Sequence, residues 1–269
     1  MLNNDIQKLV NIFREESQYF DSNFLFERKL RPIQDMFSRY EFLQWFSQSI
    51  DALKEQNDCD ILLKLPLLIR GIVDFSIDVT EDHEGIYNYK QQIIQVNYLA
   101  FNGQTQNALE LLASTETPEG IKEKIIIDKT DRASWSSTNP IFLDCLYKKM
   151  VKQGYSPNHI VLGGHGAYRA GLMFATMLGI NNIHTIRCSL HKMDDKGPIL
   201  PEYEKKSLGD KLRGSTVLIY EEDVECGRSI ESLKKLVMEF EPKEIKTATS
   251  QTKAPRKTDF YGFHCGSFF

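Results

Sequence analysis

The segment VLIYEEDVECGRSI, from Val217 to Ile230, decides the fold. Its first four residues are apolar and predict a buried strand, which would carry Glu221 and Glu222 at its carboxyl end. Residues 225–229 predict a short turn into a helix, where Gly227 lets the backbone approach a ligand closely. The N–H groups of such a turn, with the helix N-terminus and a serine hydroxyl, suit a phosphate group. Two carboxylates beside a phosphate cradle predict a site for a sugar phosphate.

The surrounding C-terminal half repeats the order strand, turn, helix. Strands are predicted at 160–162 and 183–188, a Gly-rich turn at 163–167, a long polar loop at 190–213, a strand near 245, and helices at 141–153, 168–178 and 229–240. This order is typical of βαβ units and a parallel sheet. Ligands of such sheets bind at the carboxyl ends of the strands, where these loops lie.

The N-terminal half is predicted to be mainly helical. Apolar residues recur at helical spacing over 6–13, over 33–50 after Pro32, and again at 107–112. Alternating apolar residues at 73–79 predict one short strand. The polar loop 114–120 is the predicted boundary between a helical domain, residues 1–120, and a sheet domain, residues 121–269. The expected fold class is therefore α/β, with a Rossmann-like parallel-sheet domain preceded by a mainly α-helical domain.

Composition places the chain among ordinary globular proteins. It has 269 residues, of which 41% are apolar and 26% charged. The longest apolar stretch, 61–69, is interrupted by Lys64 and Pro66 and is too short to span a membrane. The N-terminal residues lack the pattern of a signal peptide, and the five cysteines form no C-x-x-C pair. We therefore expect a reduced, cytoplasmic protein with neither a disulfide framework nor a zinc site.

Charge is distributed unevenly along the chain. The net charge of −4 divides into −8 for residues 1–125 and +4 for residues 126–269. The basic half indicates an anionic ligand, although ordinary variation between two solvated surfaces accounts equally well for the difference. A nucleic-acid partner is not expected, because such surfaces carry a dense stripe of lysine and arginine.

The Val217–Ile230 segment resembles the phosphoribosyl-pyrophosphate motif of type I phosphoribosyltransferases, in their hypoxanthine-guanine branch. The resemblance implies that Glu221 and Glu222 bind the ribose hydroxyls, directly or through Mg²⁺, and that Glu225 is the general base. It also implies a 5-phosphate loop made by four residues of the turn, Cys226, Gly227, Arg228 and Ser229. Two positions depart from the family pattern: Cys226 replaces a threonine and Glu225 replaces an aspartate.

The resemblance continues toward the end of the chain. Lys253 falls where the family places a lysine that reaches the exocyclic oxygen of a 6-oxopurine, although a lysine taken alone is most often a surface residue. Asp259–Phe263 is similar to the Asp-Phe-Val-Gly-Phe stretch of that branch. Phe268 or Phe269 would stack on the base, or the N-terminal half would complete the base pocket.

Upstream, the Gly-rich turn occupies the place of the family's pyrophosphate loop. The residues implied to bind pyrophosphate there are Gly163, Gly164, His165, Gly166 and Arg169. The mobile lid of the family carries a Ser-Tyr pair, which appears here as Ser189-Leu190, and Tyr203 or Lys205 would have to substitute for the tyrosine. The resemblance covers residues 125–269 and leaves the first 120 residues unmatched.

The implied activity is transfer of a 5-phosphoribosyl group from Mg²⁺-phosphoribosyl pyrophosphate to a nucleobase, with a 6-oxopurine as the expected acceptor. The alternative is a protein that senses phosphoribosyl pyrophosphate or a nucleotide without turnover and acts on a partner through its N-terminal half. A fold relative with another chemistry is a third reading. A homo-oligomer or a protein partner bound through the N-terminal half is expected, and a membrane partner is not.

Overall fold

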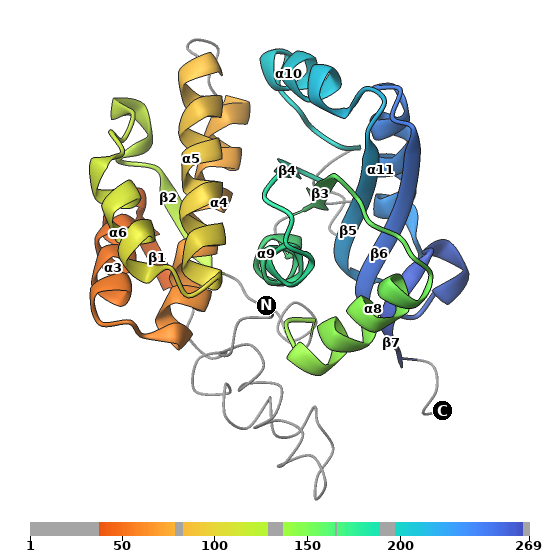
Figure 1. The fold of residues 1–269 in the computed structure, drawn as a ribbon. Coiled ribbons are helices and arrows are strands. Elements are labelled where there is room, and N and C mark those ends of the chain that lie inside the picture. Colours follow the sequence, from red (N-terminus) through yellow and green to blue (C-terminus); the bar gives the residue numbers. More distant parts are fainter. Residues whose placement is uncertain (1–37, 79–82, 129–136, 165, 189–196, 266–269) are drawn as a thin grey trace, which may run out of the picture.

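The computed structural model describes residues 38–78, 83–128, 137–164, 166–188 and 197–265 (Figure 1). Its centre is a five-stranded sheet in the order β4-β3-β5-β6-β7. All neighbouring strands of this sheet are parallel. The strands are β3 (His159–Gly163), β4 (Ile183–Ile186), β5 (Thr216–Val224), β6 (Glu244–Thr252) and β7 (Phe260–His264). The predicted parallel sheet is confirmed.

Helices cover both faces of the sheet. Because successive residues of a strand point to opposite faces, Leu218 and Tyr220 of β5 pack with α8 (Pro140–Lys152) and α9 (Ala167–Leu178). Val217 and Ile219 pack on the other face with α10 (Glu202–Leu212) and α11 (Arg228–Met238). Alternate apolar residues on buried strands therefore produce two separate apolar layers, one on each side of the sheet.

The N-terminal part is helical, as predicted, and lies against α9 (Figure 1). Its elements are β1 (Ser38–Glu41), α3 (Phe42–Lys54), α4 (Asp58–Asp78), α5 (His83–Phe101), α6 (Thr105–Ser114), the short helix η1 (Glu119–Ile121) and β2 (Ile125–Asp128). We call α3–α6 the helical layer. Strands β1 and β2 pair with each other in an antiparallel ribbon, and Trp45 of α3 packs beneath it through a hydrogen bond to the Ile126 carbonyl.

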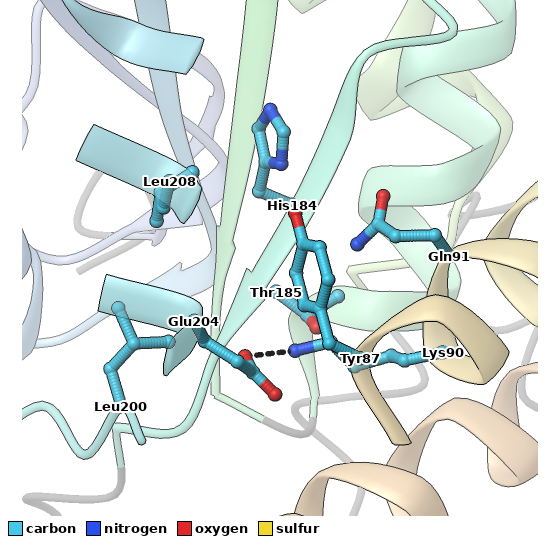
Figure 2. Close-up of a pocket in the computed structure, with 8 residues that line it drawn as sticks. All are labelled: Tyr87, Lys90, Gln91, His184, Thr185, Leu200, Glu204 and Leu208. Atoms are coloured by element: carbon cyan, nitrogen blue, oxygen red, sulfur yellow. Dashed lines mark hydrogen bonds and ion pairs between the residues drawn. The ribbon is translucent and has the colours of Figure 1, made fainter. Parts of the chain in front are cut away.

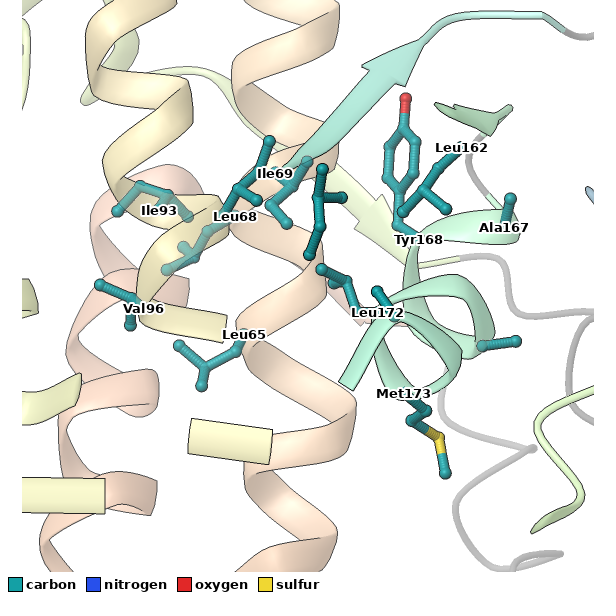
Figure 3. Packing of buried hydrophobic residues seen from close by; sticks show 14 of the residues in the cluster. Leu65, Leu68, Ile69, Ile93, Val96, Leu162, Ala167, Tyr168, Leu172 and Met173 are labelled. Carbon is teal, nitrogen blue, oxygen red and sulfur yellow. The ribbon is translucent and has the colours of Figure 1, made fainter. Parts of the chain in front are cut away.

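Helix α9 is enclosed between the sheet and the helical layer. Every residue from Ala167 to Met177 is buried, and a helix without a polar face requires apolar partners all around it. Figure 3 shows part of this core: Leu65, Leu68 and Ile69 of α4 and Ile93 and Val96 of α5 lie on one side, and Leu162 of β3 lies on the other with Tyr168, Leu172 and Met173 of α9. Helices α4 and α5 both contact α9. One continuous apolar core therefore joins the helical layer to the sheet.

A proline creates a polar contact at the same interface. Pro66 lies inside α4, and because proline has no N–H, the carbonyl of Leu62 loses its helical partner. Arg169 of α9 supplies a replacement, with its Nε donating to the Leu62 oxygen at 3.1 Å. The carbonyl that Pro66 leaves without a partner inside α4 therefore accepts a hydrogen bond that joins α4 to α9.

Three expectations from the sequence are wrong. Residues 73–78 continue α4 and do not form a strand, because Leu65, Leu68, Ile69 and Ile72 establish a helical apolar stripe that extends through them. Residues 38–41 form β1, and α3 begins only at Phe42, where the Glu41 backbone N–H donates a capping hydrogen bond to Oε1 of Gln44. Within the predicted loop 190–213, residues 202–212 form α10, which buries Leu208 and Leu212 one turn apart.

The other predicted helices and strands are confirmed within a few residues, namely 107–112, 141–153, 160–162, 168–178, 183–188 and 229–240. The helix over 6–13 and the start of the one after Pro32 lie outside the described residues. The domain boundary at residue 120 stays a prediction. The apolar core crosses that boundary, and β2, which follows it, pairs with β1, which precedes it. Among the described residues, no helix is both long and apolar enough to cross a membrane.

We predict that Leu172→Ala destabilises the helical layer and the sheet together. Leu172 is fully buried, and truncating a buried leucine costs about 2–5 kcal/mol in the free energy of unfolding. Urea denaturation followed by far-UV circular dichroism and by tryptophan fluorescence should show one shared transition at lower urea. Val151→Ala, at a side chain that is mostly exposed, is the control and should shift the midpoint little. Two separate transitions, of which only one moves, would contradict a shared core.

Candidate functional site

The strand order places the candidate site between β3 and β5. The chain proceeds from β3 outward to β4 and then returns past β3 to β5, so that the sheet changes direction between these two strands. Ligands of open parallel sheets bind at such a point, outside the carboxyl ends of the strands. The two loops there are the Gly-rich turn after Gly163 and the turn at 225–227 before α11. The fold therefore brings together the two segments that the sequence analysis singled out.

Glu221 lies at the carboxyl end of β5 beneath α11 and is 7% exposed. Burial raises the pKa of this carboxyl well above its usual range, and the nearby Glu222 raises it further. The Ser229 hydroxyl donates a hydrogen bond to Glu221 that opposes this rise in pKa. The hydrogen bond between Glu221 and Ser229 therefore joins the end of β5 to the first turn of α11. Burial of the ionisable carboxyl is unfavourable for the folded state at neutral pH.

Glu222 is the more accessible of the two carboxylates. As the next residue on the strand it points to the opposite face of the sheet from Glu221, and it is half-buried. Among the described residues no group of three His, Cys, Asp or Glu side chains is arranged to hold a metal ion. Glu221 and Glu222 are the carboxylates at this strand end that could hold a magnesium ion, with its remaining oxygens supplied by the ligand and water, as this ion commonly prefers.

The turn at 225–227 has the conformation expected of an anion cradle. Gly227 adopts φ 84°, a left-handed conformation that favours glycine, and stands immediately before α11. The N–H groups of the first helical turn have no partner within the helix and point toward this loop. The backbone N–H of Arg228 lowers the pKa of the exposed Cys226 thiol, and Nε of Arg228, which donates to the Cys226 sulfur at 3.4 Å, lowers it further.

Lys253 and Glu225 meet at the neighbouring edge of the site. The Lys253 ammonium lies 2.5 Å from Oε1 of Glu225, and both side chains are largely exposed. The Lys253 N–H also donates to the Val224 carbonyl, which joins the loop after β6 to the end of β5. The Glu225 carboxylate raises the pKa of Lys253. The implied general base and the implied base selector are therefore paired with each other.

A second lysine, not identified from the sequence, lies over the same turn. A Cβ atom at Gly227 would come within 2.8 Å of the Cβ and Cγ atoms of Lys257. The ammonium of Lys257 pairs with Glu231 in the first turn of α11 at 2.7 Å. Lys257 belongs to the short helix η2 (Pro255–Lys257). Because Lys257 and Gly227 are far apart in the sequence, no local sequence pattern predicts this contact.

The turn after β3 also contacts the end of β4. Gly164 has φ 76°, its N–H donates to the Ile186 carbonyl, and a Cβ there would lie 2.7 Å from the Cys188 oxygen. The Cys188 thiol in turn contacts the Ser229 carbonyl at 4.0 Å. The loops after β3, β4 and β5 therefore meet at one place.

The structure shows one contact of Arg169 with α4, and its role in the pyrophosphate loop stays a prediction. Arg169 is 7% exposed, and its Nε binds the Leu62 carbonyl of α4. Another arginine, Arg187, directly follows β4. Its neighbour in sequence, Ile186, accepts the hydrogen bond from the Gly164 N–H. The position of Arg187 at a strand's carboxyl end is a signal that sequence reasoning could have used.

The two candidates for the missing lid tyrosine are held elsewhere. The Tyr203 ring packs edge-on against Tyr87 of α5, with ring centroids 5.9 Å apart. Lys205 pairs with Glu239 after the C-terminal end of α11, roughly 15 Å along the helix axis from its first turn. His165, Ser189, Leu190, Phe268 and Phe269 lie outside the described residues.

The Asp259–Phe263 stretch has a structural role in this chain. The Asp259 carboxylate accepts hydrogen bonds from the Thr247 N–H and hydroxyl, both at 2.8 Å, and so ties β6 to the start of β7. Phe263 stacks on Phe142 of α8 with ring centroids 4.7 Å apart. The stretch holds the β7 edge of the sheet in place.

A small polar cavity lies between the helical layer and the sheet, apart from the two loops (Figure 2). Its volume is about 10 Å³, which is room for about one water molecule. Lys90 of α5 and Glu204 of α10 form a fully buried ion pair on its wall. Glu204 Oε1 and Thr185 Oγ1 are buried there without a hydrogen-bond partner among the described residues. The polar lining and small volume favour a bound water over a larger ligand.

No protein-family model matches the chain, and no curated protein matches its sequence. Solved structures of hypoxanthine-guanine-type phosphoribosyltransferases match about half of it. A purine phosphoribosyltransferase from Pyrococcus horikoshii Ot3 is 21% identical, with 48% of this chain and 82% of that chain covered and a TM-score of 0.36. The enzyme from Leishmania tarentolae in complex with GMP is 14% identical, with 50% and 78% covered and a TM-score of 0.35.

A hypothetical protein from Neisseria gonorrhoeae with bound ppGpp is 17% identical, with 41% of this chain and 65% of that chain covered and a TM-score of 0.34. These similarities concern the sheet half of the chain. The roles of individual residues are inferred below from this chain's own sequence and contacts.

We predict that Glu221→Gln makes the protein more stable at neutral pH. The raised pKa of Glu221 means that the folded state binds its proton more tightly than the unfolded state, so the stability of the parent falls as pH rises from about 4.3 through the raised value. Glutamine can still accept the Ser229 hydrogen bond and carries no charge to bury.

The measurement is the urea midpoint of both proteins between pH 4 and pH 8. The stability advantage of Glu221→Gln should be small at the acid end and grow toward neutral pH. Glu239→Gln, at an exposed carboxylate, is the matched control and should show no such growth. An advantage of Glu221→Gln that does not change with pH would show that ionisation of Glu221 is not its cause.

Proposed function

We propose that this protein binds Mg²⁺-phosphoribosyl pyrophosphate and transfers the 5-phosphoribosyl group to a nucleobase, with a 6-oxopurine as acceptor. The observation that carries the proposal is that the loops after three neighbouring strands, β3, β5 and β6, lie at the same edge of the sheet. One loop offers glycine backbone, the second offers two carboxylates and a helix N-terminus, and the third offers Lys253. Pyrophosphate, ribose 5-phosphate and base would each find one of these partners.

In the proposed complex the 5-phosphate occupies the turn at 225–227, where backbone N–H groups and the Ser229 region of α11 receive it. Lys257, which lies over Gly227, adds a positive charge beside this phosphate. Glu222 binds the ribose hydroxyls from the accessible face of β5. Glu221, bonded to Ser229, orients the turn as well as the sugar.

The reaction forms a bond between C1 of the ribose and a nitrogen of the base, and breaks the bond from C1 to pyrophosphate. The protein holds the two partners in line and stabilises the departing negative charge. Glu225 accepts the proton that the base nitrogen loses, and Lys253 donates to the exocyclic oxygen of the base. The ion pair between Lys253 and Glu225 must break before either group can contact the base. Binding of the base and release of Glu225 as a proton acceptor are therefore coupled.

Glu221 and Glu222 would hold a magnesium ion, which would supply positive charge to neutralise the pyrophosphate. Of these two carboxylates, Glu222 is half-buried and Glu221 is deeply buried beneath α11. We further propose that the protein works in the cytoplasm and forms a homo-oligomer or binds a protein partner through its N-terminal half.

The second candidate function is binding of the same donor without turnover. The Glu225–Lys253 ion pair favours it. While they are paired, Glu225 is not available to accept a proton from the base, and Lys253 is not available to donate to the exocyclic oxygen. The cysteine at 226 favours it as well, since the loop lacks the hydroxyl donor that the family pattern has there. In this reading the chain reports the level of phosphoribosyl pyrophosphate to a partner.

The two functions predict different outcomes of one experiment. Pyrophosphate release from phosphoribosyl pyrophosphate and Mg²⁺ is measured with hypoxanthine, guanine, xanthine, adenine, uracil and orotate separately, and donor binding is measured by calorimetry. Release with 6-oxopurines alone supports the transferase and Lys253 as its selector. Donor binding without release with any base supports the sensor. A chain that neither binds nor consumes the donor rules out both.

We predict that Lys253→Met removes the preference for 6-oxopurines and leaves donor binding within about twofold of the parent, because in the proposed complex the base, and not the donor, contacts this ammonium. The ratio of kcat/KM for hypoxanthine to that for adenine should fall about tenfold or more, since a hydrogen bond from a charged group is lost. Lys243→Met, at an exposed lysine before β6, is the control. An unchanged ratio in Lys253→Met would assign base selection to another residue.

A further inference from the structure

Helix α4 of the helical layer carries two charged residues on the side that faces the end of β4. Arg70 and Asp74 are four residues apart and therefore lie on one face of the helix, one turn from each other. Asp74 Oδ1 lies 2.7 Å from Nη1 of Arg187, with each side chain about one quarter exposed. An ion pair thus joins α4 to the carboxyl end of the sheet.

This ion pair lies beside the Gly-rich turn of the candidate site. Arg187 follows β4 between Ile186, whose carbonyl accepts the Gly164 N–H, and Cys188, whose oxygen lies against Gly164. All four charged groups of this region, Arg70, Asp74, Arg187 and Glu204, act electrostatically on the buried phenol of Tyr168, in the first turn of α9 directly after the turn. The helical layer therefore brings charge to the proposed pyrophosphate end of the site.

The balance of charge and hydrogen bonds there favours an anion. Glu204 is engaged by Lys90 in the buried pair, so that of the two described carboxylates acting on Tyr168 only Asp74 is left beside the two guanidinium groups. Nε of Arg70 is buried and has no hydrogen-bond partner among the described residues. A buried donor without an acceptor is costly, and an anionic oxygen would satisfy it with a charge-assisted hydrogen bond.

We propose that Arg70, together with Arg187, binds the pyrophosphate group seated on the turn at Gly163 and Gly164, so that the helical layer completes the ligand site. The naming of pyrophosphate rests on the proposed function, while the anion site rests on the contacts above. Asp74 is a positioning residue that holds Arg187 and moderates its charge. The ligand would bind in the junction between two parts of the chain more than a hundred residues apart in sequence.

The test measures binding of inorganic pyrophosphate, ribose 5-phosphate and phosphoribosyl pyrophosphate to the full chain by calorimetry in the presence of Mg²⁺. Arg70→Met should weaken pyrophosphate and phosphoribosyl pyrophosphate by about tenfold or more, the effect of losing a charged hydrogen-bond donor. Ribose 5-phosphate, which does not reach this end of the site, should stay within about twofold. Arg213→Met, which removes an exposed guanidinium at the end of α10, is the matched control.

A second variant keeps the inference falsifiable if Arg70→Met perturbs folding. Asp74→Asn removes the carboxylate that neutralises Arg187 and should tighten pyrophosphate binding by about threefold, because the site gains net positive charge. A merely damaged interface would weaken binding in both variants. Tightening by Asp74→Asn and weakening by Arg70→Met together require that the two residues act on the anion through their charges.

The outcomes separate this inference from the proposed function. Pyrophosphate that binds to Arg70→Met as tightly as to the parent overturns the inference and leaves the proposed function intact if phosphoribosyl pyrophosphate still binds. Pyrophosphate that binds in an Arg70-dependent manner, in a parent that does not bind phosphoribosyl pyrophosphate, supports the anion site and overturns the proposed function. A parent that binds none of the three compounds overturns both.

Discussion

Helix α9 is buried on all sides, and the arrangement of the other helices and the sheet depends on covering it. Its residues are buried from Ala167 to Met177, so the sheet can cover only one side of the helix and another apolar layer must cover the other. Leu65, Leu68, Ile93 and Val96 of the helical layer provide that cover. The N-terminal half is therefore part of the folding unit that positions the turn before α9, and the ligand site depends on it.

The candidate site combines features that stabilise a ligand with features that are costly to the folded chain. Glu221 is buried as an ionisable group, Gly227 adopts a left-handed conformation, and the Arg70 Nε is buried without an acceptor. Such unfavourable local features gather at functional sites because the surrounding structure can sustain them and a ligand relieves some of them. Their concentration around the carboxyl ends of β3, β4 and β5 is an independent sign that this edge binds a ligand.

Helix α4 engages two arginines of the sheet half. Pro66 leaves the Leu62 carbonyl without its partner in the helix, and the Nε of Arg169 binds this carbonyl. Arg187, which directly follows β4, pairs with Asp74 of the same helix. The helical layer therefore holds one arginine through a backbone carbonyl and the other through a carboxylate.

The parallel sheet, most helices around it, and the position of Glu221 and Glu222 at the end of a strand could be predicted from the sequence, because each of these is encoded by residues close together in the chain. The anion site at 225–229 stays a prediction. Local pattern misled at 73–79, where a longer helical stripe prevailed, and at 202–212, where two buried leucines stabilise a helix in a polar segment. Three contacts could not be predicted from the sequence: Arg169 with the Leu62 carbonyl of α4, Lys253 with Glu225, and Arg187 with Asp74. These contacts join residues far apart in sequence, and their partners are selected by packing around α9, which no local pattern encodes.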